Sequence, residues 1–151
     1  MLKGRKNKME IKDISVLVAD DDHQVLKMTV RTMGYLVSPA NITTATDGEE
    51  ALQTYLRNPG KFQVVASDNT MPRRKGVDLF AELNRLEMSE PVIYKPCGKI
   101  LISGDNDPYS KLIGVMKALG GHHLAKPYLQ EELFAAARAA FADYEARIKS
   151  A

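Results

Sequence analysis

The sequence predicts an α/β fold built on a parallel β-sheet. Short apolar and β-branched runs alternate with longer segments whose apolar residues recur every three or four positions, the pattern of strands alternating with amphipathic helices. Several strand candidates are apolar throughout, as expected for strands that helices cover on both faces. The 151 residues, 44% of them hydrophobic, are enough for one domain with a substantial core.

Five strand–helix units follow one another along the chain. The strands are expected at residues 14–19, 42–45, 62–67 and 100–103, and in a fifth run that ends at residue 125. The helices that follow them are expected at about 22–33, 48–57, 77–87, 107–119 and 130–148. This (βα)₅ pattern contains no internal repeat and no low-complexity linker.

Residues that begin and end helices set these boundaries. Asp22 is an N-cap candidate, and Gly34 follows the last apolar residue of the first helix, where glycine commonly ends helices. Asp107 and Pro108 predict the start of the fourth helix, since proline suits the first helical turn. Segment 89–99 is the least regular, and we interpret it as a long loop or an added edge element, with Gly98 interrupting any strand there.

Composition excludes several classes of function. The net charge of +2 and the lack of a basic stripe argue against nucleic-acid binding. No apolar stretch is long enough to cross a membrane. A single cysteine, Cys97, excludes an internal disulfide and fits a reducing compartment, so we expect a cytoplasmic protein and interpret Cys97 as an ordinary thiol in a loop.

The domain organisation follows from the position of the first strand. Residues 1–12 are basic and lack the apolar core of a signal peptide, so we expect a flexible tail. Residues 13–149 hold the five strand–helix units and form the expected domain. Because the sequence ends soon after the last predicted helix, we expect no output domain.

Acidic, hydroxyl and ammonium side chains stand where four of the predicted strands end. Asp20 and Asp21 follow the first strand, and Asp68 follows the third. Ser103 ends the fourth strand and Lys126 follows the fifth. The carboxyl ends of parallel strands meet at one edge of the sheet, where ligands bind, so these side chains should converge. Mg²⁺ would relieve the repulsion among three carboxylates, and a lysine can hold a phosphoryl oxygen.

Each residue alone has a commonplace interpretation. Asp68 could cap a turn, Ser103 could end a strand, and Lys126 could be an ordinary surface lysine. It is the combination across four strand ends that is specific. His122 and His123 are adjacent in a strand and therefore point to opposite faces, which argues against a shared metal ion. The basic run 73–75 is interpreted as a solvated loop.

The residues that carry these features also resemble a known family. The segments VLVADDD, TATDGEEAL, VVASDNTMPRRKGVDL, ILISGDND and HHLAKPYLQEEL together resemble the receiver domains of two-component response regulators, over about residues 14–148. The resemblance implies a flavodoxin-like, doubly wound three-layer sandwich whose five parallel strands lie in the order 2-1-3-4-5.

The resemblance also implies roles for the residues at the strand ends. Asp68 corresponds to the phosphoacceptor. Asp20 and Asp21 correspond to the acidic pair that holds Mg²⁺, with Asp68 and the backbone carbonyl of Thr70 as further ligands. Asp21 is expected to be the more direct ligand of the two. These roles are what the family implies for the matching positions.

Further positions match the residues that respond to phosphorylation in members of this family. Ser103 corresponds to the hydroxyl that turns toward the phosphoryl group, and Lys126 to the family's lysine. His123 stands where members usually carry tyrosine or phenylalanine. It also introduces a group that can titrate near neutral pH. The family further implies a cis peptide bond between Lys126 and Pro127. Segments 36–41 and 89–99 look longer than the corresponding segments of this family.

The function implied is a phosphorylation switch rather than an enzyme, apart from the protein's own phosphorylation and dephosphorylation. The phosphoryl donor would be a sensor histidine kinase or a histidine phosphotransfer protein. A downstream protein would bind the face formed by the fourth helix, the fifth strand and the fifth helix. Isolated members can also form homodimers. No membrane or nucleic-acid partner is expected.

Two alternatives remain open at this point. The chain could be a receiver-like interaction module that works without phosphate, which the two long segments and His123 would suit. It could also be a Mg²⁺-dependent phosphohydrolase with an aspartate nucleophile. Such enzymes usually carry a second aspartate two residues after the first, and Thr70 occupies that position here.

Overall fold

The computed structural model describes residues 8–105 and 110–150. Residues 1–7 of the expected tail, and Asp107 and Pro108 at the expected start of the fourth helix, lie outside the described residues. The strands are β1 (Val16–Ala19), β2 (Ile42–Ala45), β3 (Val64–Asp68), β4 (Gly98–Ser103) and β5 (His122–Ala125). The helices are α2 (His23–Met33), α3 (Gly48–Arg57), α4 (Gly76–Ser89), α5 (Lys111–Ala118) and α6 (Gln130–Ser150), with short 3₁₀ turns η1 (Ile11–Asp13) and η2 (Pro39–Asn41).

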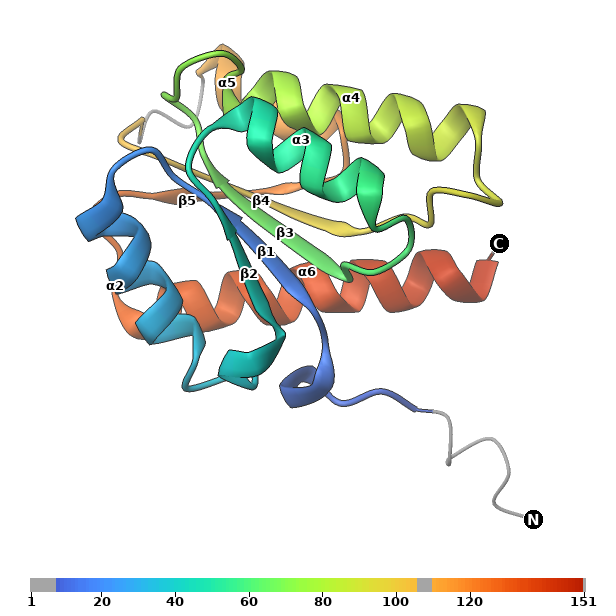
Figure 1. The fold of residues 1–151 in the computed structure, drawn as a ribbon, viewed down its shortest axis with the longest axis horizontal. Coiled ribbons are helices and arrows are strands. Elements are labelled where there is room, and N and C mark those ends of the chain that lie inside the picture. The colour runs from blue at the N-terminus through green and yellow to red at the C-terminus, as the bar shows by residue number, and fades with distance from the viewer. Residues whose placement is uncertain (1–7, 106–109, 151) are drawn as a thin grey trace.

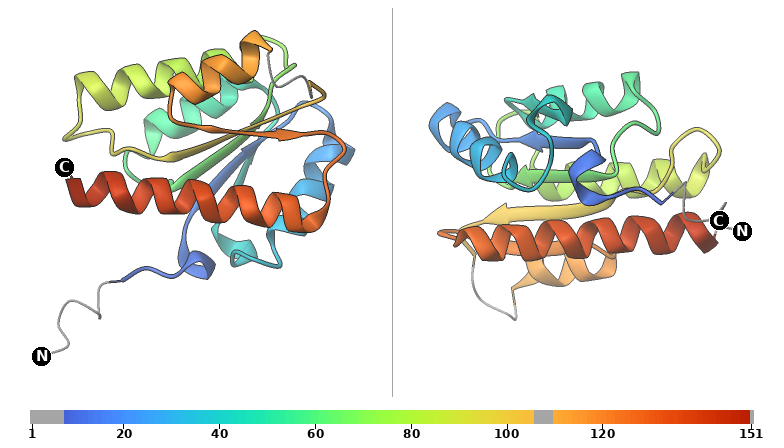
Figure 2. Two further views of the ribbon diagram at one scale, coloured as in Figure 1. Left: turned by 180° about the vertical axis from the view of Figure 1, so that it is seen from behind. Right: turned by 90° about the horizontal axis from the view of Figure 1, so that it is seen from below.

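The five strands form one parallel sheet in the order β2-β1-β3-β4-β5, which confirms the predicted flavodoxin-like class. Helices α2 and α6 cover one face, and α3, α4 and α5 cover the other (Figures 1 and 2). Two apolar cores result because successive strand residues point to opposite faces. Val64 and Ile100 belong to the core under α2 and α6. Val65 and Leu101 belong to the core under α3, α4 and α5.

The register of the strands brings the polar strand ends to one edge of the sheet. Ala19 of β1 pairs with Ser67 of β3, so Asp20 and Asp68 follow paired positions. At the other side of β3, Asp68 pairs with Ile102. Ser103 of β4 pairs with Ala125 of β5, which places Lys126 one residue beyond. The convergence predicted from the sequence therefore follows from the register.

Helix starts agree with the capping analysis except at the fourth helix. The side chain of Asp22 accepts hydrogen bonds from the backbone N–H groups of residues 24 and 25 and caps α2. In the described part of the chain, α5 begins at Lys111 rather than near residue 107. Its N-cap is Ser110, whose hydroxyl accepts the N–H of Ile113 at 3.2 Å. A serine can cap a helix as well as an aspartate can.

Segment 89–99 divides into a loop and a strand. Residues 90–97 form the expected loop, but Gly98 and Lys99 begin β4, two residues before the predicted start. No strand forms at residues 92–94, as expected, but Gly98 is the first residue of β4 rather than part of the loop. A Cβ at Gly98 would lie 2.1 Å from the carbonyl oxygen of Ala140, so glycine lets α6 approach the sheet closely.

A buried polar cluster lies at the end of β4 opposite Ser103. Lys99 is fully buried, and its ammonium group donates to both carboxylate oxygens of Glu87 at 2.9 Å and to the Cys97 carbonyl at 3.1 Å. The buried thiol of Cys97 lies 3.4 Å from the same carboxylate. Arg147 of α6 reaches this loop, donating to the carbonyl oxygens of Cys97 and Gly120. Cys97 lies in the loop, as the sequence suggested, but its thiol is buried beside Glu87 and Lys99.

The last helix is long and packs on the sheet through a narrow apolar stripe of Leu133, Ala137, Ala140 and Phe141. Phe134 is only partly buried and Ile148 is exposed. Across residues 8–105 and 110–150, none of the helices is both long enough and apolar enough to span a bilayer.

Candidate functional site

Three carboxylates gather at the carboxyl edge of the sheet. One carboxylate oxygen from each of Asp20, Asp21 and Asp68 lies within 4.8 Å of the others. Asp20 and Asp68 are buried, whereas Asp21 is exposed. Oxygen ligands from carboxylates, completed by waters and phosphate oxygens, are what Mg²⁺ prefers. The acidic residues predicted from the sequence therefore do come together, in an arrangement that could hold a hard divalent cation.

Asp20 is held in place by the start of α2. Its Oδ1 accepts the backbone N–H of Asp22 at 2.9 Å, while Asp22 itself caps the helix. Burial raises the pKa of the Asp20 carboxyl above its ordinary value of 3.8. The Asp22 N–H partly opposes this, and the negative charge of Asp68 adds to it. A cation in the cluster would stabilise the ionised form of Asp20.

Lys126 supplies positive charge to the same cluster. Its Nζ lies 2.7 Å from Asp68 Oδ1 and 3.7 Å from Asp20 Oδ2. Burial alone would lower the pKa of the lysine, but the hydrogen bond and charge of Asp68, together with Asp20, outweigh it and raise the pKa. The peptide bond between Lys126 and Pro127 is cis, as the family resemblance implied. Lys126 is therefore charged and placed to neutralise charge at Asp68.

The loop after β3 is anchored to the start of α4 directly after Asp68. Asn69 accepts the N–H of Val77 on its side-chain oxygen at 3.1 Å and that of Gly76 on its backbone carbonyl. A Cβ at Gly76 would lie 2.3 Å from the Asp68 carbonyl oxygen, so α4 begins against the backbone of the site only because residue 76 is glycine. Thr70 lies in this loop and is exposed.

The basic run 73–75 is more ordered than the sequence suggested. Arg73 has a positive φ of 69°, and its guanidinium lies 3.6 Å from the Asp47 carboxylate at the start of α3. Arg74 is half-buried and pairs with Glu49 at 3.4 Å. Both arginines thus contact the start of α3. Arg73 and Lys75 are exposed, as the predicted solvated loop implies, and only Arg74 is partly buried.

Ser103 and His123 form a direct hydrogen bond. Ser103 is buried at the end of β4, and its Oγ lies 2.6 Å from His123 Nε2 on the neighbouring strand. The adjacent His122 instead contacts Asp143 of α6 at 2.5 Å. The two histidines therefore point to opposite faces of β5, as the strand alternation predicted.

One interaction near the site had no signal in the sequence. The hydroxyl groups of Thr29 in α2 and Tyr128 in the β5–α6 connection lie 2.7 Å apart. Tyr128 follows the cis peptide bond directly, so this hydrogen bond ties the segment that carries Lys126 to the first helix. Asn69 could have been found, since it directly follows Asp68 and precedes a helix start.

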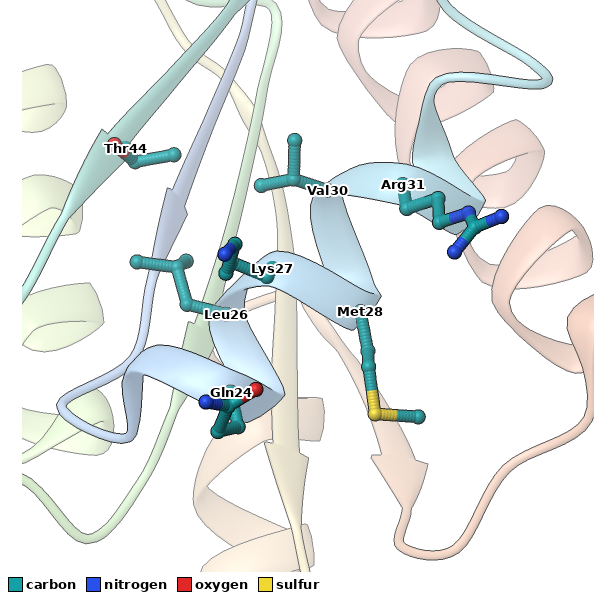
Figure 3. Close-up of a pocket in the computed structure, with 7 residues that line it drawn as sticks. All are labelled: Gln24, Leu26, Lys27, Met28, Val30, Arg31 and Thr44. Atoms are coloured by element: carbon teal, nitrogen blue, oxygen red, sulfur yellow. The ribbon is translucent and has the colours of Figure 1, made fainter.

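Two grooves flank Met28 of α2, a residue that is 67% exposed. One groove, of about 590 Å³, lies between α2 and β2, and Figure 3 shows Leu26 and Val30 pointing toward Thr44 while Met28 points away. The second groove, of about 430 Å³, lies on the other side of Met28 and includes Lys126 and Pro127. Because Lys126 contacts Asp68, the second groove borders the acidic cluster.

Comparisons with known proteins agree with this geometry. Residues 16–138 match the family described as the response regulator receiver domain. The chain is 34% identical over 118 residues to the two-component response regulator ARR12 of Arabidopsis thaliana, covering 78% of this chain and 18% of that protein. It is 24% identical to ARR22 of the same plant, covering 87% of each. The chain spans less than a fifth of the first two curated relatives.

Solved structures lead to the same family. The chemotaxis response regulator CheY4 of Vibrio cholerae superposes with a TM-score of 0.65 and 26% identity, over 82% of this chain and 94% of that one. A CheX–CheY complex from Borrelia burgdorferi, whose description includes BeF₃ and Mg²⁺, superposes with a TM-score of 0.68 and 24% identity, over 85% and 89% of the two chains. At this identity the second likeness supports the fold alone. With the family matching most of the residues, this chain belongs to the response regulator receiver domains.

Proposed function

We propose that the protein accepts a phosphoryl group on Asp68 from a phosphohistidine and passes the signal on by a change in partner binding. The contact between Lys126 Nζ and Asp68 Oδ1, inside a cluster of three carboxylates, is the observation that carries this proposal. A nucleophilic carboxylate needs nearby positive charge, which offsets the negative charge that arrives with the phosphoryl group.

The proposed chemistry is an in-line displacement at phosphorus. A carboxylate oxygen of Asp68 forms the new P–O bond, and the P–N bond of the donor's phosphohistidine breaks. The imidazole leaves with the bonding electron pair, and Asp68 becomes an acyl phosphate. Because Oδ1 accepts the Lys126 hydrogen bond, we assign the attack to Oδ2. Catalysis is then positioning and charge stabilisation.

The donor set of the site fits Mg²⁺. Asp20, Asp21 and Asp68 would hold the ion, together with the backbone carbonyl of Thr70, which lies two residues after Asp68. When bound, Mg²⁺ would neutralise negative charge on the phosphoryl oxygens. The raised pKa of Asp20 supports this assignment, since burial next to Asp68 makes the carboxylate costly without a cation.

The remaining side chains have roles after transfer. Lys126 would hold a phosphoryl oxygen while it also neutralises Asp68. Ser103 would donate its hydroxyl to another phosphoryl oxygen, and His123 would respond to that movement. The downstream protein would then recognise the face made by α5, β5 and α6, and we assign no turnover of external substrates.

The donor protein must bring its phosphohistidine to the mouth of the acidic cluster. The groove that holds Met28 and Lys126 borders that mouth, so a donor protein would cover it. Exposed apolar side chains such as Met28 are what a docking partner buries, and Lys27 and Arg31 add positive charge on the same helix. We therefore expect Met28→Glu to slow transfer from a histidine phosphotransfer protein but not from acetyl phosphate.

Intact-mass analysis after incubation with Mg²⁺ and acetyl phosphate tests the proposal. The wild type should gain one phosphate, and Asp68→Asn should gain none while keeping its circular dichroism spectrum. Chelation of Mg²⁺ should abolish the adduct as well. Stoichiometric labelling of Asp68→Asn would refute the assignment. No adduct on the wild type, with beryllofluoride also without effect, would favour the phosphate-independent interaction module.

A further inference from the structure

We propose that His123 is a positioning residue that holds the Ser103 hydroxyl away from the phosphoryl site in the resting protein, by accepting its hydrogen bond. This inference rests on the proposed phosphorylation of Asp68. Ser103 Oγ and His123 Nε2 lie 2.6 Å apart, and the serine is only 7% exposed. A buried hydroxyl keeps a partner at all times, so Ser103 can reach a phosphoryl oxygen only by exchanging one acceptor for another.

The register of β4 and β5 makes this contact possible. His123 pairs with Leu101, and Ser103 follows Leu101 by two residues on the same strand. Side chains two apart share a face, so Ser103 and His123 are diagonal neighbours on the face that α5 covers. The contact is therefore a consequence of backbone pairing and not of a mobile loop.

A third group is compatible with the direction that the proposal assigns to this hydrogen bond. The backbone N–H of Asp105 donates to Ser103 Oγ at 3.3 Å, which occupies one of the two acceptor sites of the hydroxyl and leaves its own hydrogen available for His123 Nε2. This arrangement requires a neutral imidazole that carries its proton on Nδ1. Burial lowers the pKa of His123 below its ordinary value, partly opposed by the charge of Asp105, and so favours the neutral form.

Release of the hydrogen bond would change the position of His123 in a surface groove that a partner could bind. His123 lines a groove of about 530 Å³ between α5, β5 and the start of α6, with Ile113 and Met116 from α5 and Glu132 from α6. The ring is only half-buried, so water can replace Ser103 as its partner. Among the described residues, no atom lies within 4 Å of a Cβ built at Gly104, so the space beside this glycine is open. The hydroxyl exchange would thus free His123 to reorient in this groove.

Binding of beryllofluoride with Mg²⁺, measured by calorimetry, tests the inference. His123→Phe removes the resting acceptor and should tighten binding by roughly 2- to 10-fold, the range expected for one neutral hydrogen bond. The same substitution in a Ser103→Ala background should change nothing, because no hydroxyl remains to be held. His122→Phe, which alters the neighbouring residue but not the Ser103 contact, is the matched control and should bind like the wild type.

A second readout does not depend on affinity. Nitrogen-15 spectra of the histidines should show His123 protonated on Nδ1 in the resting protein, and its Nε2 signal should move when beryllofluoride is added. A resting His123 protonated on Nε2 would overturn the inference, as would equal or weaker binding by His123→Phe, or an effect that persists in Ser103→Ala. If the wild type fails to bind beryllofluoride, the proposed function itself fails and this inference fails with it.

Discussion

Lys99 is fully buried in β4, and its ammonium group donates to both carboxylate oxygens of Glu87 at 2.9 Å. The pair joins the end of α4 to the start of β4, directly beside the loop formed by residues 90–97. Two charges taken out of water are tolerated only when each satisfies the other. This pair therefore fixes where the loop begins and ends, at the opposite end of β4 from Ser103.

The first prediction concerns the Glu87–Lys99 ion pair. Glu87→Gln and Lys99→Met should each lower the free energy of unfolding by about 3–5 kcal/mol, because each leaves an uncompensated buried charge. The double variant should recover much of that loss, since neither charge remains. Urea denaturation of the wild type, the two single variants and the double variant measures the effect.

The matched control is Glu82→Gln, which breaks the exposed ion pair between Glu82 and Arg85 on the same helix. Solvent screens that pair, so little change in stability is expected. If Glu87→Gln behaved like Glu82→Gln, the buried pair would have no special role in stability.

The second prediction concerns the thiol of Cys97. Burial raises its pKa to about 12, with Lys99 opposing and Glu87 reinforcing the shift. The thiolate is the reactive form, so the folded protein should react slowly with a maleimide at pH 8, while the urea-unfolded chain reacts at once. Glu87→Gln should speed the reaction of the folded protein more than tenfold, because reaction follows opening of this region. Complete labelling of the folded wild type within minutes would contradict the burial of Cys97.

The fold and most of the acidic cluster could be predicted because each depends on local patterns and one general rule. Asp20, Asp68 and Lys126 each follow an apolar strand, and parallel strands end at the same edge of a sheet. Neither step requires knowledge of side-chain packing. The same logic predicted that His122 and His123 point to opposite faces.

The parts that could not be predicted depend on contacts between distant residues. Lys99 looks like a solvent-exposed residue before a strand, and only its proximity to Glu87 on α4 allows it to be buried. Gly98 looks like a strand breaker, yet the close approach of Ala140 makes glycine necessary there. The hydrogen bond between Thr29 and Tyr128 joins residues 99 positions apart, which no local pattern encodes.

The third prediction concerns Mg²⁺ and stability. Mg²⁺ binds the folded cluster and not the unfolded chain, so it should raise the free energy of unfolding by about 1.4 kcal/mol at ten times its dissociation constant. Asp20→Asn should lose most of this response, yet be no less stable than the wild type in chelator. Its amide oxygen can still accept the Asp22 N–H, and one repelling charge is gone. Urea titrations with Mg²⁺ and with chelator measure both effects.

Asp22→Asn provides the control for this experiment. Asp22 is adjacent to the acidic cluster but caps α2, and asparagine caps helices equally well. Its Mg²⁺ response should match that of the wild type. A response lost equally in Asp20→Asn and Asp22→Asn would show that general acidity, rather than the cluster, attracts the ion.

The fourth prediction concerns pH and His123. Burial lowers the pKa of His123 below its ordinary 6.5, so at pH values below 6.5 the unfolded chain binds more protons at this residue than the folded protein. Stability contributed by His123 is therefore fully present above pH 6.5 and is lost as the pH falls from there through the lower pKa of the folded protein. The neighbouring charges at its groove, Asp105, Lys117 and Glu132, are retained in a His123→Phe variant.

The unfolding free energy of the wild type minus that of His123→Phe should thus decrease from pH 7.5 to pH 5.5, because His23 and His122 are present in both proteins. Urea denaturation across this range measures the difference, and a difference that grew toward low pH would mean that the folded protein binds the proton more tightly and that Ser103 is not donating to a neutral imidazole.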